Sequence, residues 1–171
     1  MTVPEVEKAL KTLTILVDTR EQPTGASQRR LDSLGYPYRK QKLDYGDYSA
    51  VITLDGEEIP LTKTIAIERK MSLDEISSNL TAHRDRFLRE FERAEVEKCK
   101  MYVLVEGGSW DKIKRHDYNS KFNTKAFEAS LLMLMARYNM PIIFVPSIYS
   151  GQMIGQIIYR EAKEYLLKLE R

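Results

Sequence analysis

A short strand-like run ends in three consecutive charged residues, Glu68, Arg69 and Lys70, directly after the apolar stretch 65–67. Charged side chains are costly to bury without partners, so a strand that ends in this way needs a reason. Because side chains alternate along a strand, Glu68 and Lys70 point to one face and Arg69 to the other. A carboxylate that can hold a hard cation, beside an ammonium that can hold phosphate or water, suits phosphodiester hydrolysis. Taken alone, the same residues fit a solvated strand end with its own ion pair at least as well.

A second acidic position precedes this strand. Gly46 marks a turn or a close backbone approach, and Asp47 stands at the head of the next strand-like run, residues 48–54. An acidic residue on one strand, followed by Glu-x-Lys on a later strand, is the outline of the PD-(D/E)XK nuclease site. Asp47 therefore joins Glu68 and Lys70 as a site candidate.

A third acidic segment lies further upstream. Asp18, Arg20 and Glu21 follow the buried strand candidate 14–17, and loops just past strand ends often carry function. The alternative for this segment is turn chemistry with a local ion pair.

Together these segments resemble the nuclease domain of the XPF-type, or ERCC4-domain, structure-specific endonucleases. The family pattern is Gly-Asp, then Glu-Arg-Lys followed after three residues by Asp, with an earlier Val-Asp-x-Arg-Glu. This sequence has the same segments in the same order along the chain: the run 17–21, Gly46-Asp47, the run 68–70 and Asp74. By motif the resemblance covers residues 15–106, and it continues more loosely to the C-terminus.

The resemblance implies an α/β fold with a restriction-endonuclease-like core, a central mixed sheet flanked by helices, and metal-dependent cleavage of branched or otherwise structured DNA. On this basis Asp47 and Glu68 hold Mg²⁺ or Mn²⁺, and Asp18 completes the acidic cluster or binds a second ion. Lys70 orients or deprotonates the attacking water. Further active-site candidates are Glu21, Arg69 and Asp74.

Two of these candidates also have structural explanations. Arg69 points off the face of Glu68 and would support the acidic loops through an ion pair. Ser72 and Glu75 have capping-box spacing for a helix that begins at residue 73, so Asp74 would lie in its first turn, where the dipole favours negative charge. For Asp74, both the catalytic and the structural role remain open.

Basic residues offer local contacts for DNA phosphates, because the net charge of +2 gives no global attraction. Basic side chains interleave with aromatic ones over residues 110–125, a composition that suits nucleic-acid contact and also fits an ordinary surface loop. The candidates are Arg20, Arg84, Arg86, Lys112, Lys114 and Arg115, with Arg29 and Arg30 on the polar side of a helix as a second patch.

Hydrophobic periodicity predicts the elements that position these residues. Strands are expected at 14–17, 38–43, 48–54, 58–61, 64–69, 100–106 and 141–145, and helices at 26–34, from 73, and at 83–98, 124–138 and 152–168. Their alternation in the second half indicates one α/β domain over residues 1–171, with 1–12 as an N-terminal arm of uncertain order.

Composition limits the class of protein. Cys99 is the sole cysteine, which excludes an intrachain disulfide framework and fits a reducing cytosol. The N-terminus lacks a signal-peptide pattern, and the longest apolar run is too short for a membrane span. We expect a cytoplasmic protein without an organic cofactor, which is nucleoid-associated if its source is bacterial or phage. The resemblance implies a short free-standing family member of the kind found in bacteria and phages, without the helix-hairpin-helix module of larger relatives.

The last predicted helix has a broad apolar face, formed by Ile154, Ile157, Ile158, Ala162, Tyr165, Leu166 and Leu169. This width exceeds one sheet contact and predicts a homodimer joined through these helices, as the family resemblance also implies. In the alternative, the helix at 124–138 covers the extra face.

A different functional class, a catalytically silent DNA-binding or dimer-partner subunit, is disfavoured because Asp47, Glu68 and Lys70 are all present.

Overall fold

The computed structural model describes residues 1–21 and 24–169, and within them seven strands form one mixed sheet. The strands are β1 (Thr14–Val17), β2 (Tyr38–Lys40), β3 (Tyr48–Leu54), β4 (Glu57–Pro60), β5 (Ile65–Lys70), β6 (Lys100–Glu106) and β7 (Ile142–Val145). The helices are α1 (Val3–Leu10), α2 (Gly25–Asp32), α3 (Leu73–Leu80), α4 (Arg84–Val96), α5 (Trp110–Lys114), α6 (Thr124–Tyr138) and α7 (Ser150–Lys168), with a 3₁₀ turn at Ser147–Tyr149. The predicted elements are present, although β2 ends at Lys40 and is shorter than the predicted strand 38–43. α5 lies in the segment 110–125, for which no helix was predicted.

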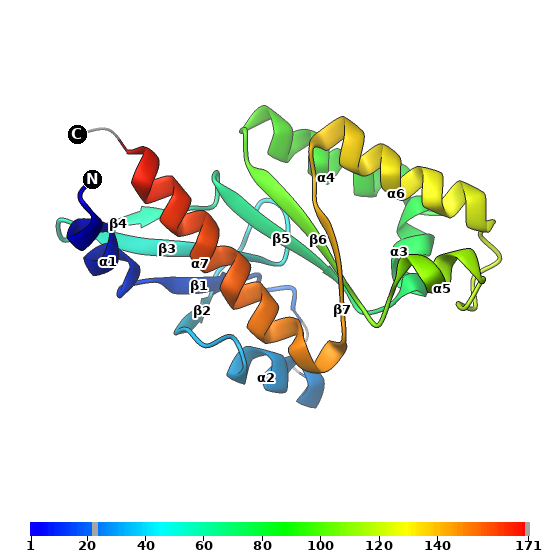
Figure 1. The fold of residues 1–171 in the computed structure, drawn as a ribbon, viewed down its shortest axis with the longest axis horizontal. Coiled ribbons are helices and arrows are strands. Elements are labelled where there is room, and N and C mark those ends of the chain that lie inside the picture. Colours follow the sequence, from blue (N-terminus) through cyan, green and yellow to red (C-terminus); the bar gives the residue numbers. More distant parts are fainter. Residues whose placement is uncertain (22–23, 170–171) are drawn as a thin grey trace.

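The sheet has the order β2-β1-β3-β5-β6-β7, and β4 pairs with β3 as the predicted hairpin. β3 runs antiparallel to β1, β4 and β5, whereas β5, β6 and β7 are mutually parallel. Helices cover both faces, with α1, α2 and α7 on one and α3, α4 and α6 on the other (Figure 1). The predicted α/β class and mixed sheet are confirmed. None of the described helices is long and apolar enough to cross a lipid bilayer.

Alternation along β5 decides which helices its charged end faces. Ile65 and Ile67 pack in the core under α7, whereas Ala66 packs in the core formed with α3, α4 and α6. Continuing this alternation sends Glu68 toward α3 and α4 and Arg69 toward the opposite face. The apolar half of the strand thus orients its charged half.

The N-terminal segment forms α1, with a proline in its first turn and Thr2 as its capping residue. Val6, Ala9 and Leu10 are buried, and α1 packs against α7. The amino group of Met1 donates a hydrogen bond to the carbonyl of Leu169 at 3.0 Å. The two ends of the described chain are therefore in contact.

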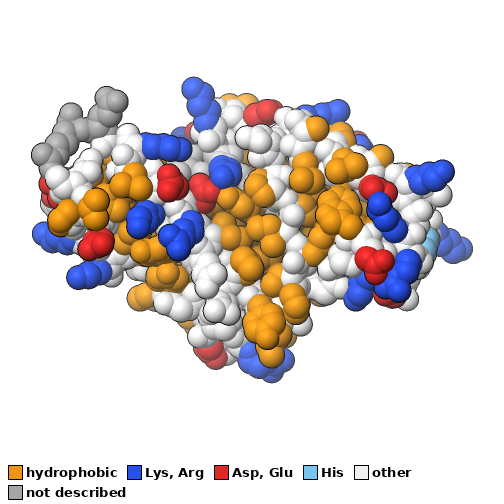
Figure 2. Space-filling view, viewed as in Figure 1, with side chains coloured by type: hydrophobic (Ala, Val, Ile, Leu, Met, Phe, Trp, Pro, Cys, Tyr) orange, Lys and Arg blue, Asp and Glu red, His pale blue; other side chains and the backbone are white. Residues whose placement is uncertain are grey.

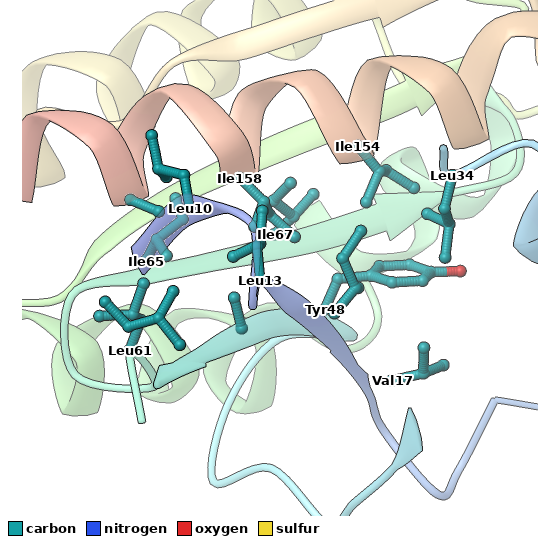
Figure 3. Close-up of a cluster of buried hydrophobic side chains, with 14 of the residues drawn as sticks. Leu10, Leu13, Val17, Leu34, Tyr48, Leu61, Ile65, Ile67, Ile154 and Ile158 are labelled. Atoms are coloured by element: carbon teal, nitrogen blue, oxygen red, sulfur yellow. The ribbon is translucent and has the colours of Figure 1, made fainter. Parts of the chain in front are cut away.

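The broad apolar face of α7 is used inside the molecule. Ile154, Ile158, Ala162 and Leu166 are fully buried, and Figure 3 shows Ile154 and Ile158 pointing into a cluster with Ile65 and Ile67. α1 and α2 cover the remainder of this face, while α6 packs on the other side of the sheet. The inference of a dimer from the width of this face is therefore wrong, and so is the alternative in which the helix at 124–138 covers it.

Two glycines let α7 approach α2 closely. A Cβ added at Gly151 would lie 2.2 Å from the carbonyl oxygen of Arg30, and one at Gly155 would lie 2.0 Å from that of Leu34. Both neighbours are backbone atoms at the end of α2, so they cannot rotate away. This contact fixes α2 relative to the sheet.

We expect Gly155→Ala to lower the free energy of unfolding by about 1–3 kcal/mol or more, because the methyl group overpacks a rigid contact. Chemical denaturation measured by circular dichroism checks this value. Gly25→Ala is the matched control, since its Cβ would lie 3.5 Å from Arg29 Nη1, an ordinary contact within a helix. Equal stability of Gly155→Ala and wild type would contradict the close approach.

Candidate active site

A cavity of about 310 Å³ lies at the end of β5, between the segment before β3 and the helices α3 and α4. Its lining residues come from five parts of the chain: Arg20, Asp47, Glu68, Lys70, Glu75, Asn79, His83, Arg86, Phe87 and Glu90. The structure thus brings Asp47, Glu68 and Lys70 together, with Arg20 and Arg86 beside them.

Backbone hydrogen bonds hold Asp47 against the end of β5. Its N–H donates to the carbonyl of Ile67 at 2.8 Å, and its carboxylate oxygen Oδ2 accepts from the N–H of Arg69 at 2.8 Å. Gly46 has a φ of +71°, and a Cβ there would lie 3.1 Å from the Cβ of Ala66 and 3.2 Å from the carbonyl oxygen of Ile67. Glycine at position 46 therefore permits both the turn and the close approach that the sequence predicted.

Glu68 and Lys70 form a buried ion pair. Lys70 Nζ donates to Glu68 Oε1 at 2.5 Å, and the residues are only 7% and 6% exposed. Lys70 Nζ also lies 4.8 Å from the ring centroid of Phe87, a cation–π contact. The predicted shared face of Glu68 and Lys70 is confirmed.

Burial disfavours the ionised form of both carboxylates, and the Asp47 charge disfavours that of Glu68 as well. Burial raises the pKa of Asp47 to about 6, although the Arg69 N–H and the Lys70 charge oppose this change. Burial and the nearby Asp47 charge raise the pKa of Glu68 to about 8 against the opposing effect of Lys70. For Lys70, burial lowers the pKa, but the charge and hydrogen bond of Glu68 raise it more, so the ammonium stays protonated.

This donor set fits a hard divalent cation. No group of three His, Cys, Asp or Glu side chains suited to a metal occurs in the described part of the chain. Mg²⁺ is nevertheless commonly held by one or two carboxylates together with water and substrate oxygens. Asp47 and Glu68 supply two such carboxylates, and a cation between them would relieve their mutual repulsion.

Asp18 lies behind the cavity and does not line it. It is fully buried, and Oδ1 accepts from Arg20 N at 2.8 Å and from Arg20 Nε at 2.7 Å. Oδ2 accepts from the N–H of Leu43 at 2.7 Å and from Arg20 Nη2 at 3.2 Å. Burial raises the pKa of Asp18, but the hydrogen bonds from Arg20 and Leu43 lower it further, so the net direction is down. The structure therefore places Asp18 as a support for Arg20, unlike the metal-ligand role expected for it.

Glu21 and Arg69 belong to an ion-pair network on the opposite side of the sheet from the Glu68–Lys70 pair. Arg69 makes a two-pronged contact with Glu106 at 2.8 and 2.9 Å, as its predicted supporting role required. Arg30 pairs with Glu21 and lies 3.5 Å from Glu106. Arg30 is therefore buried inside this network, and its predicted place in a phosphate-binding surface patch is wrong.

The carboxylate of Asp74 accepts hydrogen bonds from the segment after α5. Its Oδ2 accepts from Asn119 Nδ2 at 2.9 Å and its Oδ1 accepts from the N–H of Ser120 at 2.7 Å. Asp74 also occupies the first turn of α3, which Ser72 caps as predicted. Both carboxylate oxygens are engaged outside the cavity, which favours the structural role.

Most of the other basic candidates have local partners. Arg84 Nη1 donates to the carbonyl of Leu80 at 3.3 Å, and Lys112 Nζ donates to that of Gly107 at 2.9 Å. Lys114 and Arg115 pair with Glu128 and Asp111, at 3.7 and 2.6 Å. Arg20 and Arg86 are the two DNA-contact candidates that line the cavity.

Sequence reasoning missed the wall formed by α3 and α4, whose cavity-lining members are Glu75, Asn79, His83, Phe87 and Glu90. These positions recur at spacings of four and three residues along two consecutive helices, a signal of one shared face. Their mixture of charge types hid that signal, because α4 reads as a solvated, ion-paired helix.

Comparison with protein families matches residues 17–156 to the ERCC4 domain. Among solved structures, XPF from Aeropyrum pernix is similar with a TM-score of 0.58 and 22% identity, covering 92% of this chain and 62% of that chain. XPF from Aeropyrum pernix in complex with DNA has a TM-score of 0.58 and 19% identity, over 92% of this chain and 68% of that one. No curated protein matches. The likeness confirms the predicted restriction-endonuclease-like fold.

Wild-type stability should fall as pH rises between about 4.5 and 8, the ordinary and the raised pKa of Glu68. In this window the folded protein binds more protons than the unfolded chain, so the free energy of unfolding decreases with pH. We expect Glu68→Gln, which cannot ionise, to reduce that fall by at least about 1 kcal/mol, the equivalent of one pKa unit. Denaturant titrations across this pH range, without added metal, measure the difference.

Glu58→Gln is the control for this experiment. Glu58 is exposed, and its hydrogen bond from Arg39 lowers its pKa, so this variant should keep the wild-type pH dependence. A wild-type stability that stays level or rises from pH 5 to pH 8 would show that Glu68 is not destabilised by its surroundings.

Proposed function

The chain belongs to the ERCC4 domain family, and from that premise we propose that it is a divalent-metal-dependent endonuclease that hydrolyses phosphodiester bonds in branched or otherwise structured DNA. The observation that carries the proposal is the convergence of Asp47, Glu68 and Lys70 in one cavity with Arg20 and Arg86 beside them. The similar XPF structure in complex with DNA supports DNA as the partner.

Asp47 and Glu68 are the residues that would hold Mg²⁺ or Mn²⁺. The cation supplies a more acidic bound water and stabilises negative charge on the reacting phosphate. Of the two roles expected for Lys70, we set aside deprotonation of the water, because the raised pKa of Lys70 keeps it protonated. It is therefore assigned to orienting water and neutralising charge in the transition state.

Arg20 and Arg86 are assigned to the phosphate. The guanidinium of Arg20 donates two hydrogen bonds to Asp18, which fix its orientation. The Arg20 side chain is nevertheless 55% exposed. A guanidinium recognises two phosphate oxygens at once, which a lysine cannot do. Asp18 thus contributes by positioning Arg20.

A homodimer remains part of the proposal, on a different surface from α7. β7 is an edge strand of the sheet, and Ile142, Ile143 and Phe144 are only partly covered. Ile148 and Tyr149, which follow directly, are 75% and 55% exposed. Figure 2 shows hydrophobic side chains gathered in the middle of this face, where Figure 1 draws β6 and β7. An apolar edge strand favours pairing with a second copy, as the family resemblance implies.

Cleavage should require Asp47, Glu68 and Lys70. We expect Asp47→Asn, Glu68→Gln and Lys70→Ala each to lower kcat/KM at least about a hundredfold, because each change removes transition-state stabilisation of roughly 3 kcal/mol or more. Flap, fork, junction and linear DNAs, incubated with Mn²⁺, Mg²⁺, Ca²⁺ or chelator, test this on gels. Ca²⁺ should support binding without turnover, since its looser oxygen geometry positions water poorly.

Asp74→Asn is the control, because the Asp74 carboxylate lies outside the cavity and should affect stability more than turnover. Wild-type turnover by Glu68→Gln, or efficient cutting in chelator, would reject the assignment.

Light scattering should report about twice the 19.9 kDa chain mass at micromolar concentration. Ile143→Glu should convert that species to a folded monomer, because it places a charge in the apolar interface. Val96→Glu on α4 is the control, since Val96 is 82% exposed and lies away from β7. A wild type that stays monomeric over this range would remove the dimer from the proposal.

A further inference from the structure

A second cavity, of about 400 Å³, lies beside the candidate active site at the turn between α3 and α4. All of its lining residues come from the segment 81–89. His83 and Arg86 line both cavities, so the two cavities adjoin. A DNA strand with one phosphate in the active-site cavity can therefore place a neighbouring phosphate in the second cavity.

The two cavities differ in charge. The active-site cavity is lined by four carboxylates and three cationic side chains. The second cavity is lined by Arg84, Arg86 and Arg89, against the single carboxylate of Asp85. A hollow lined mainly by one sign of charge concentrates ions of the opposite sign. The second cavity therefore attracts phosphate without a metal ion, which the active-site cavity cannot do while its carboxylates are ionised.

Two of these arginines are not neutralised by the helix on which they lie. Arg84 donates a hydrogen bond to the carbonyl of Leu80. Within the described chain, however, the guanidinium groups of Arg86 and Arg89 form no ion pair or hydrogen bond. Carboxylates lie three and four residues away along α4, a spacing at which ion pairs form, yet they do not pair with these arginines. Like charges at that spacing are unfavourable, so the free pair favours an anionic ligand.

We propose that the second cavity binds a backbone phosphate of the cleaved DNA strand, next to the scissile phosphate, and that this binding needs no metal ion. This inference rests on the proposed endonuclease activity and adds a subsite to it. Arg89 belongs to the second cavity alone, whereas Arg86 borders both. Guanidinium groups suit this ligand, because each can bind two phosphate oxygens at once. The strand therefore docks beside the active site before a cation is bound.

Fluorescence anisotropy with a labelled fork DNA, in chelator and at several salt concentrations, tests the subsite without cleavage. We expect wild type to bind and Arg89→Ala to raise the Kd at least about fivefold. The slope of log K against log salt should become shallower by about 0.7–0.9, the change for one phosphate contact. Arg89→Lys keeps the charge and should keep the slope. Arg137→Ala is the matched control, because Arg137 is exposed on α6 and lies outside both cavities.

Neutral linkages identify the phosphate that is bound. A methylphosphonate removes the charge of one linkage and can be placed at each position near the branch in turn. At the linkage next to the cut position, it should weaken wild-type binding at least about fivefold and weaken Arg89→Ala binding at most about twofold, because that variant has already lost the contact.

Two further measurements separate this role from a structural or a catalytic one. Arg89→Ala should leave the Tm unchanged or raise it, because it removes one cation from beside two others. At saturating DNA and Mn²⁺, its kcat should change less than about threefold, since Arg89 does not line the active-site cavity.

Several results would overturn the inference. These are a wild type that does not bind DNA in chelator, an Arg89→Ala variant with the wild-type Kd and salt slope, and a methylphosphonate effect that is equal in both proteins. A loss of Tm in Arg89→Ala would instead make the residue structural. A wild type that binds but cleaves none of the DNAs with Mn²⁺ overturns the proposed function as well, whereas wild-type cleavage together with unchanged binding by Arg89→Ala overturns this inference alone.

Discussion

The burial of two carboxylates side by side at the end of β5 is the constraint on which the rest of the structure depends. Asp47 and Glu68 repel each other, and burial adds to the cost of their charges. Backbone contacts, which do not depend on those charges, keep Asp47 close to β5. The backbone of Asp47 bonds to Ile67, and Gly46 allows the chain to approach β5 closely. The backbone therefore holds an arrangement that the side chains alone would oppose.

The two faces of β5 divide the charged residues into a reactive set and a supporting set. Glu68 and Lys70 face the cavity, whereas Arg69 joins Glu106 on the other side of the sheet. Arg30, from α2, reaches the same Glu106 and also pairs with Glu21. Because α7 packs closely on the end of α2 through Gly151 and Gly155, the supporting network is tied to the core. This explains why α7, which contributes no cavity residue, still matters to the site.

Periodicity in the sequence predicted the strands and the main helices, and alternation along one strand predicted that Glu68 and Lys70 share a face. The grouping of Asp47 with them followed from the PD-(D/E)XK outline and the family resemblance. Sequence patterns were less informative about the roles of the Asp18 and Asp74 side chains. The hydrogen-bond partners of these side chains include Leu43 and Ser120, which lie far away in the sequence and which no local spacing specifies. The wrong inference of a dimer from the wide apolar face of α7 has a related cause. Periodicity shows that a helix face is apolar but not which element covers it.

The charges that line the cavity also bear on how a phosphate would enter it. Four described carboxylates, Asp47, Glu68, Glu75 and Glu90, face three cationic side chains, Lys70, Arg20 and Arg86. With all of them ionised the cavity is net negative and repels a phosphodiester. Protons offset this charge on Asp47 and Glu68, whose pKa values are raised, but a protonated carboxyl group is a poor ligand. A bound divalent cation would offset the single net negative charge of the ionised side chains and make the cavity net positive, with both carboxylates still ionised. We therefore infer that the cation would serve substrate binding as well as hydrolysis.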